Sequence, residues 1–188
     1  MSMQTIEKAG FFDAAERESL RSLDVKLTDE VESERLALAV LMLAPLMQLS
    51  TADGATTTGE FGVVESIVQR IESSFELATK EELESAGTAM GMLPFVPSAW
   101  KEADFVRARQ LLVSALMRLP EDAQHAIREF IAKGALEMAN ASGGLLHLLN
   151  ITQRERSTLH HIIEDLSLDR CAEGLHLIGK IRDRATTS

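Results

Sequence analysis

The sequence predicts an all-α protein, a single compact helical domain of about seven or eight helices. Three observations predict it. The chain has no Tyr, one Trp and only 4% aromatic residues, which removes most strand-favouring side chains, while the helix formers Ala, Leu and Glu are abundant. Most segments begin with a recognisable helix cap, and one helix-hairpin pattern occurs twice. At 188 residues, the chain is long enough to bury a core.

The first helices follow from capping residues and hydropathy. Asp13 with Glu16 predicts a short helix in an N-terminal extension over residues 1–27. Thr28 predicts the start of a long second helix that ends at about Thr51 and opens the main domain, residues 28–188. Its run "LALAVLMLAPLM", residues 36–47, is too short for a membrane span of about 20 residues, so we expect a buried central helix.

Three further helix starts have Thr followed three residues later by Glu, the signature of a capping box. They are Thr57–Glu60, Thr79–Glu82 and Thr152–Glu155. The helix from Glu60 carries an apolar stripe at helical spacing that predicts a core-facing surface. The stripe is Phe61, Val64, Ile67, Val68, Ile71 and Phe75.

The segment "GMLPFVPS", residues 91–98, has two prolines and a glycine, and predicts a connector between two halves, about 28–90 and 98–167. Ser98 is the expected cap of a helix that ends near Leu119. Pro120 then suits the start of the next helix, where its missing N–H does least harm. The last helix is expected at about 169–182.

The two halves contain an internal repeat. "LSTADG" at 49–54 resembles "MANASG" at 138–143, and Thr57 and Glu60 align with Thr152 and Glu155 after six extra residues within "GGLLHLLN". The apolar positions also align: Val64, Ile67, Val68 and Ile71 with Leu159, Ile162, Ile163 and Leu166. Each copy is therefore predicted to be an apolar helix, a small-residue turn and a capped amphipathic helix, with both hairpins sharing one interior.

These residues resemble the TerB-like family, named after bacterial tellurite-resistance proteins. The resemblance lies in "LALAVLMLAPLMQLSTADGATTTGEFGVVESIV" and, more loosely, in "IAKGALEMANASGGLLHLLNITQRERSTLHHII", and spans about residues 30–167. It implies an all-helical fold, a role in tellurite and stress response, and a divalent cation held by acidic residues in the turns. Carried over by position, the metal-binding residues are Asp53, Glu60 and Glu155; the second copy departs at Ser142, where an Asp is expected.

The turn at Asp53 has two interpretations. Asp53 and Glu60 supply two carboxylates to a hard cation, for which Ca²⁺, Mg²⁺ and Mn²⁺ are the candidates. Alternatively, Asp-Gly is only a turn pair and Glu60 only a cap that satisfies a backbone amide. The EF-hand pattern does not fit, because Leu49 and Thr51 stand at its first and third ligand positions.

The net charge of −10 disfavours binding to nucleic acid and to anionic membranes. Eight acidic residues against two basic ones fall within residues 53–84, either as a solvated helix face or as a cation-attracting lobe.

Other chemically active side chains have ordinary explanations. His160 and Glu164 stand four apart, a zinc-compatible spacing, but a solvated helix face explains them equally. Cys171, the only cysteine, rules out an internal disulfide; a nearby helix start could lower its pKa, although a buried thiol is the expected state. The apolar loop around His147 is expected to tuck onto the core or to form a binding patch.

The sequence thus predicts a non-enzymatic, cytoplasmic stress-response module with a protein partner and no membrane insertion, sensitive to a divalent cation at its acidic turns and open to homo-oligomerisation. The alternative is a metal-free helical scaffold for protein interaction. No phosphate-binding glycine loop or nucleophile elbow supports an enzyme.

Overall fold

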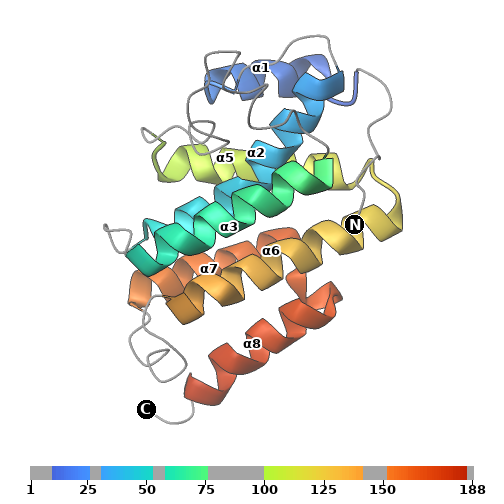
Figure 1. Cartoon of the computed structure of the whole chain (residues 1–188). Helices are drawn as coiled ribbons and strands as arrows, with labels where there is room; N and C mark the ends of the chain where they lie inside the picture. The colour runs from blue at the N-terminus through green and yellow to red at the C-terminus, as the bar shows by residue number, and fades with distance from the viewer. Residues whose placement is uncertain (1–9, 26–30, 53–57, 76–99, 142–151, 186–188) are drawn as a thin grey trace.

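Seven α-helices and one short 3₁₀ helix make up the part of the chain that the computed structural model describes, residues 10–25, 31–52, 58–75, 100–141 and 152–185. In chain order they are α1 (Ala14–Ser22), α2 (Val31–Ser50), α3 (Thr58–Phe75), α5 (Glu102–Leu116), α6 (Glu121–Ala141), α7 (Gln153–Leu166), η3 (Leu168–Arg170) and α8 (Ala172–Ala185). Figure 1 shows α3, α6 and α8 as successive layers, with α1 across one end. These ranges contain no β-strand, and the all-α prediction is confirmed.

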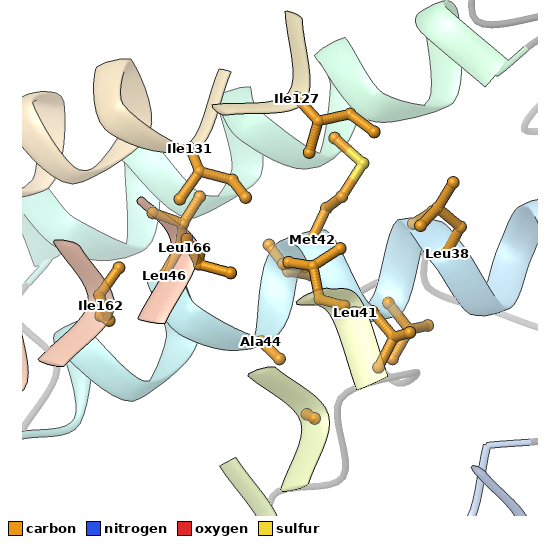
Figure 2. Packing of buried hydrophobic residues seen from close by; sticks show 14 of the residues in the cluster. Leu38, Leu41, Met42, Ala44, Leu46, Ile127, Ile131, Ile162 and Leu166 are labelled. Carbon is orange, nitrogen blue, oxygen red and sulfur yellow. The ribbon is translucent and has the colours of Figure 1, made fainter. Parts of the chain in front are cut away.

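Helix α2 lies at the centre of the core, because it is apolar on every side. It contacts α3, α5, α6 and α7, and residues 37–44 are at most 1% exposed. Figure 2 shows its side chains pointing toward Ile127 and Ile131 of α6 and toward Ile162 and Leu166 of α7. The predicted buried central helix is therefore confirmed. None of the described helices is long and apolar enough to span a membrane.

Both predicted apolar stripes face this core. All eight aligned positions are buried, including Val64 at 2% exposure and Leu159 at 1%. Phe61, however, is 54% exposed, so its prediction as a core residue is wrong. Glu60 takes the inward position instead, one turn before Val64, and is only 2% exposed. The side chain of Phe75 lies outside the described residues.

Two of the predicted capping boxes are present. At α1, the amide of Asp13 donates to Glu16 Oε2 and the amide of Glu16 donates to Asp13 Oδ1, both at 2.9 Å. At α7, the amide of Thr152 donates to Glu155 Oε2 at 2.6 Å, and the amide of Glu155 donates to Thr152 Oγ1 at 3.2 Å. The caps predicted at Thr28, Thr57 and Thr79 lie outside the described residues.

Two predicted helix boundaries need correction. The helix assigned to Ser98–Leu119 begins at Glu102 and ends at Leu116; Ser98 lies outside the described residues. Its start is marked instead by Asp104, whose carboxylate accepts the amide of Lys101 at 2.8 Å. Pro120 does directly precede α6, as expected.

The final helix was expected to begin near Asp169, and this is wrong. Ser167 adopts a left-handed conformation with φ of 50°, which ends α7. Residues 168–170 then form η3, and Cys171 is extended with φ of −131° and ψ of 158° before α8 begins at Ala172. Two helices therefore replace one, and α8 turns back along α7.

Buried carboxylates attach the N-terminal residues to the domain. Glu34, fully buried on α2, accepts the amides of Gly10 at 3.0 Å and Phe11 at 2.8 Å. Burial raises the pKa of Glu16, but hydrogen bonds from Arg118 at 2.7 Å and from the hydroxyl of Ser114 more than offset it, so this pKa lies below its usual value. These bonds fasten α1 to α5.

A buried cation fastens α5 to two further helices. Arg109 is 2% exposed and donates through Nε to the Asp165 carboxylate of α7 at 2.8 Å. It also donates to the side-chain oxygen of Gln48 on α2, and the Gln48 amide donates to Glu102 at 2.7 Å. The network fixes α2, α5 and α7 relative to one another.

Candidate functional site

The candidate site lies where the first turn of α3 meets the last turn of α6. The first elbow joins Ser50 of α2 to Thr58 of α3, and the second joins Ala141 of α6 to Gln153 of α7. Figure 1 shows the starts of α3 and α7 and the end of α6 at the same end of the molecule. A Cβ atom on Gly59 would lie 3.0 Å from the carbonyl oxygen of Ala141, so the first turn of α3 touches the last turn of α6. The start of α3, which follows the first elbow, and the end of α6, which precedes the second, are therefore neighbours.

Glu60 is the central acidic residue of the first elbow. It lies in the first turn of α3, where the amide groups of a helix N-terminus favour a negative charge. At 2% exposure it occupies the core-facing position, while the adjacent phenyl ring of Phe61 is left in solvent. Glu60 is already engaged in a polar interaction with the protein. Burying a carboxylate rather than the neighbouring apolar side chain is unfavourable unless hydrogen bonds or a cation compensate the charge. For Glu60, helix capping or ion binding would provide this compensation.

Glu155 is the corresponding acid of the second elbow, and its task is visible. It is 6% exposed and bonds the amide of Thr152, the N-cap residue of α7. One of its two carboxylate oxygens is thus used by the helix. This geometry confirms the capping interpretation of Glu155, and ion binding would have to share the carboxylate with the cap.

Asn140 adds an oxygen that the sequence analysis did not assign. Its Oδ1 atom is buried and has no hydrogen-bond partner, although it lies in the last turn of α6, next to the carbonyl of Ala141 that faces Gly59. A buried amide oxygen without a donor is rare in native proteins and suggests a missing partner. The only sequence signal was its place in "MANASG", the turn that aligns with "LSTADG".

The remaining predicted ligand is not described. Asp53 lies outside the described residues, as do Thr57 and His147. Among the residues that are described, no three His, Cys, Asp or Glu side chains come together as a metal site. The described residues therefore bring the start of α3 against the end of α6 but do not by themselves complete a set of ligands.

The two alternative centres behave as ordinary side chains. His160 Nε2 lies 3.4 Å from Glu164 Oε1, and the two side chains are 69% and 60% exposed, a solvated face of α7. Cys171 is 2% exposed and donates its thiol to the Leu168 carbonyl at 3.2 Å. Burial raises the pKa of this thiol and outweighs a hydrogen bond with the backbone of Gly174, in the first turn of α8, that acts in the lowering direction; the pKa therefore lies above its usual value.

No family model, curated protein or solved structure matches the chain. The TerB-like resemblance therefore rests only on the two sequence segments quoted above and stays a prediction.

Proposed function

We propose that this chain is a non-enzymatic helical interaction module, acting in stress response as the TerB-like resemblance implies, and that a divalent cation at its paired elbows controls its shape. One observation carries the proposal: the buried carboxylate of Glu60 lies where the first turn of α3 meets the last turn of α6. The proposed occupant is Ca²⁺, Mg²⁺ or Mn²⁺.

The chemistry of the elbows suits such an ion. Hard cations take carboxylate and carbonyl oxygens, and Ca²⁺ needs six to eight of them. Glu60 would supply a carboxylate oxygen and Asn140, in the last turn of α6, an amide oxygen. Glu155, at the matching position of α7, and Asp53 are the further carboxylates that the resemblance implies. An ion bound by α3 and α6 together would fix the angle between the two hairpins.

Thermal unfolding tests the cation. The protein is freed of metal with a chelator, and its thermal unfolding is measured with and without each ion. The proteins compared are wild type, Asp53→Asn, Glu60→Gln and a control, Glu65→Gln, which changes an exposed acid on the same helix as Glu60. An ion at about 100 times its Kd stabilises the native state by about 2.7 kcal/mol, which raises Tm by roughly 5–10 °C in a domain of this size. The shift should disappear in the two elbow variants and persist in the control. If no ion raises Tm, the cation proposal fails.

A metal-free interaction scaffold is the second candidate, favoured by Glu155. That acid is already used as a helix cap, and other buried charges such as Glu34 and Arg109 fasten helices together. In this case no ion shifts Tm, and Glu60→Gln changes stability by no more than about 1 kcal/mol, as expected for a cap.

A further inference from the structure

Helices α7 and α8 form the two sides of an open V-shaped cleft. Helix α7 ends at the left-handed Ser167, and after η3 helix α8 runs back in the opposite direction, as Figure 1 shows. Helix α8 packs on α6 and η3, and a cavity of about 850 Å³ separates it from α7. Among the described residues, the apolar lining of this cleft is formed by Ile163 on α7 and by Ile178 and Ile181, one turn apart on α8.

The charges that line the cleft are ordered along α7. Arg156 lies at the elbow end, and Glu164 follows eight residues later, about 12 Å along the helix. Asp169 adds a second negative charge beyond it, within η3. His160 lies between the two ends and contacts Glu164. The partial charges of the α7 termini have the same order, positive near Arg156 and negative near Ser167.

We infer that this cleft binds an amphipathic helix of a protein partner, lying parallel to α7. The α7 wall from Gln153 to Ser167 is about 21 Å long, which matches a partner helix of about 14 residues. Helices commonly carry acids in the first turn and bases in the last, so a parallel partner places its acids beside Arg156 and its bases beside Glu164. An antiparallel partner would instead place its acidic side chains beside Glu164 and its basic side chains beside Arg156, so that like charges face each other. The three isoleucines receive its apolar stripe, as in other helix-in-groove complexes.

This inference rests on the proposed role as an interaction module, but it needs no cation. The probe is a designed peptide of about 14 residues, with a leucine stripe, Glu in the first turn and Lys in the last. The control peptide has the same composition with Lys first and Glu last. Fluorescence anisotropy measures the binding of both to the full chain in chelator at low salt, because salt screens exposed charges.

The matched protein variant exchanges the two charges of the cleft, Arg156→Glu with Glu164→Lys; both residues are exposed, so the fold should tolerate the change. Wild type should bind the acid-first peptide about five to ten times more tightly, and the exchanged variant should prefer the other peptide. Arg154→Glu, an exposed α7 residue that does not line the cleft, should leave the preference of the wild type unchanged.

Three results would overturn the inference. The first is no binding of either peptide to wild type at about 1 mM, the weak limit of specific affinity. The second is an equal or unchanged preference in wild type and the exchanged variant. The third is a wild-type dimer, detected by sedimentation, that the exchanged variant loses, because the occupant is then a second copy of the chain. Thermal unfolding with added ions tests only the cation proposal at Glu60, whereas peptide binding in chelator tests only the cleft. The failure of one proposal can therefore be told from the failure of the other.

Discussion

Two glycines on α8 give the sharpest test of the packing around the cleft. A Cβ atom built on Gly174 would lie 1.8 Å from the carbonyl oxygen of Leu168, whereas one on Gly179 meets nothing within 4 Å. Both glycines lie inside the same helix. Replacing each by alanine therefore makes the same chemical change in two different surroundings.

The expected effects have opposite signs. Alanine is favoured over glycine in a helix interior by about 1 kcal/mol, so Gly179→Ala should raise Tm by about 2–4 °C. At Gly174, close C···O contacts need about 3.3 Å, so α8 must move by roughly 1.5 Å from η3. Forced overpacking costs about 1–3 kcal/mol or more, and the backbone oxygen of Leu168 cannot turn aside as a side chain can. Gly174→Ala should therefore lower Tm by roughly 2–12 °C.

Calorimetry of wild type and both variants at pH 7 measures the difference. Amide hydrogen exchange of Gly174→Ala should also show lost protection in α8 and η3 while α2 stays protected, because the strain is local. A Gly174→Ala variant as stable as Gly179→Ala would refute the close packing of α8 against η3, and with it the geometry of the cleft.

Three further predictions concern polar contacts. The pKa of Glu16 is lowered in the folded protein, so its contribution to stability is present above the ordinary pKa of glutamate, about 4.3, and is lost as pH falls through the lower folded value. In urea titrations between pH 6 and pH 3, Glu16→Gln should therefore lose less stability than wild type. Equal losses in the two proteins would contradict this prediction. Thr152→Ala removes the acceptor for the α7 cap and should cost about 1 kcal/mol at pH 7, measured by urea unfolding; an unchanged midpoint would rule out that cap. Arg109→Met leaves the buried side-chain oxygen of Gln48 without its guanidinium donor, whereas Asp165, whose side chain is 46% exposed, stays hydrated. The expected loss of stability, about 1–3 kcal/mol, therefore comes from the unsatisfied side-chain amide of Gln48. A variant as stable as wild type would contradict a structural role for this network.

Much of the fold was predictable because its signals are local. The caps at Asp13 and Thr152 and the apolar run of α2 need only a few neighbouring residues to be recognised. Boundaries without a capping side chain were missed. Lys101 has no such group, and Ser167 enters a left-handed conformation that sequence assigns more readily to glycine or asparagine.

The candidate site was predictable only in part, because its geometry is tertiary. Helical periodicity admits either Glu60 or Phe61 as the inward residue, and the apolar one was chosen in the sequence analysis. In the structure Glu60 is buried and Phe61 is exposed. For Asn140 the sequence offers only its place in the aligned turn "MANASG", which does not indicate a buried oxygen without a partner. The cleft likewise depends on the turn at η3, whose residues the sequence analysis assigned to the first turn of the last helix.

The two tasks proposed for Glu155 can be separated by a single substitution. In a capping box, glutamine serves as well as glutamate, because only an acceptor oxygen for the N-cap amide is needed; a cation site, in contrast, loses a charge. Glu155→Gln should therefore unfold within about 0.5 kcal/mol of wild type in chelator, as other changes that preserve local contacts do. If Glu155 is a ligand, the rise in Tm produced by Ca²⁺, Mg²⁺ or Mn²⁺ should shrink in this variant. If the full rise remains while Glu60→Gln abolishes it, the ion is held by the first elbow and Glu155 only caps α7.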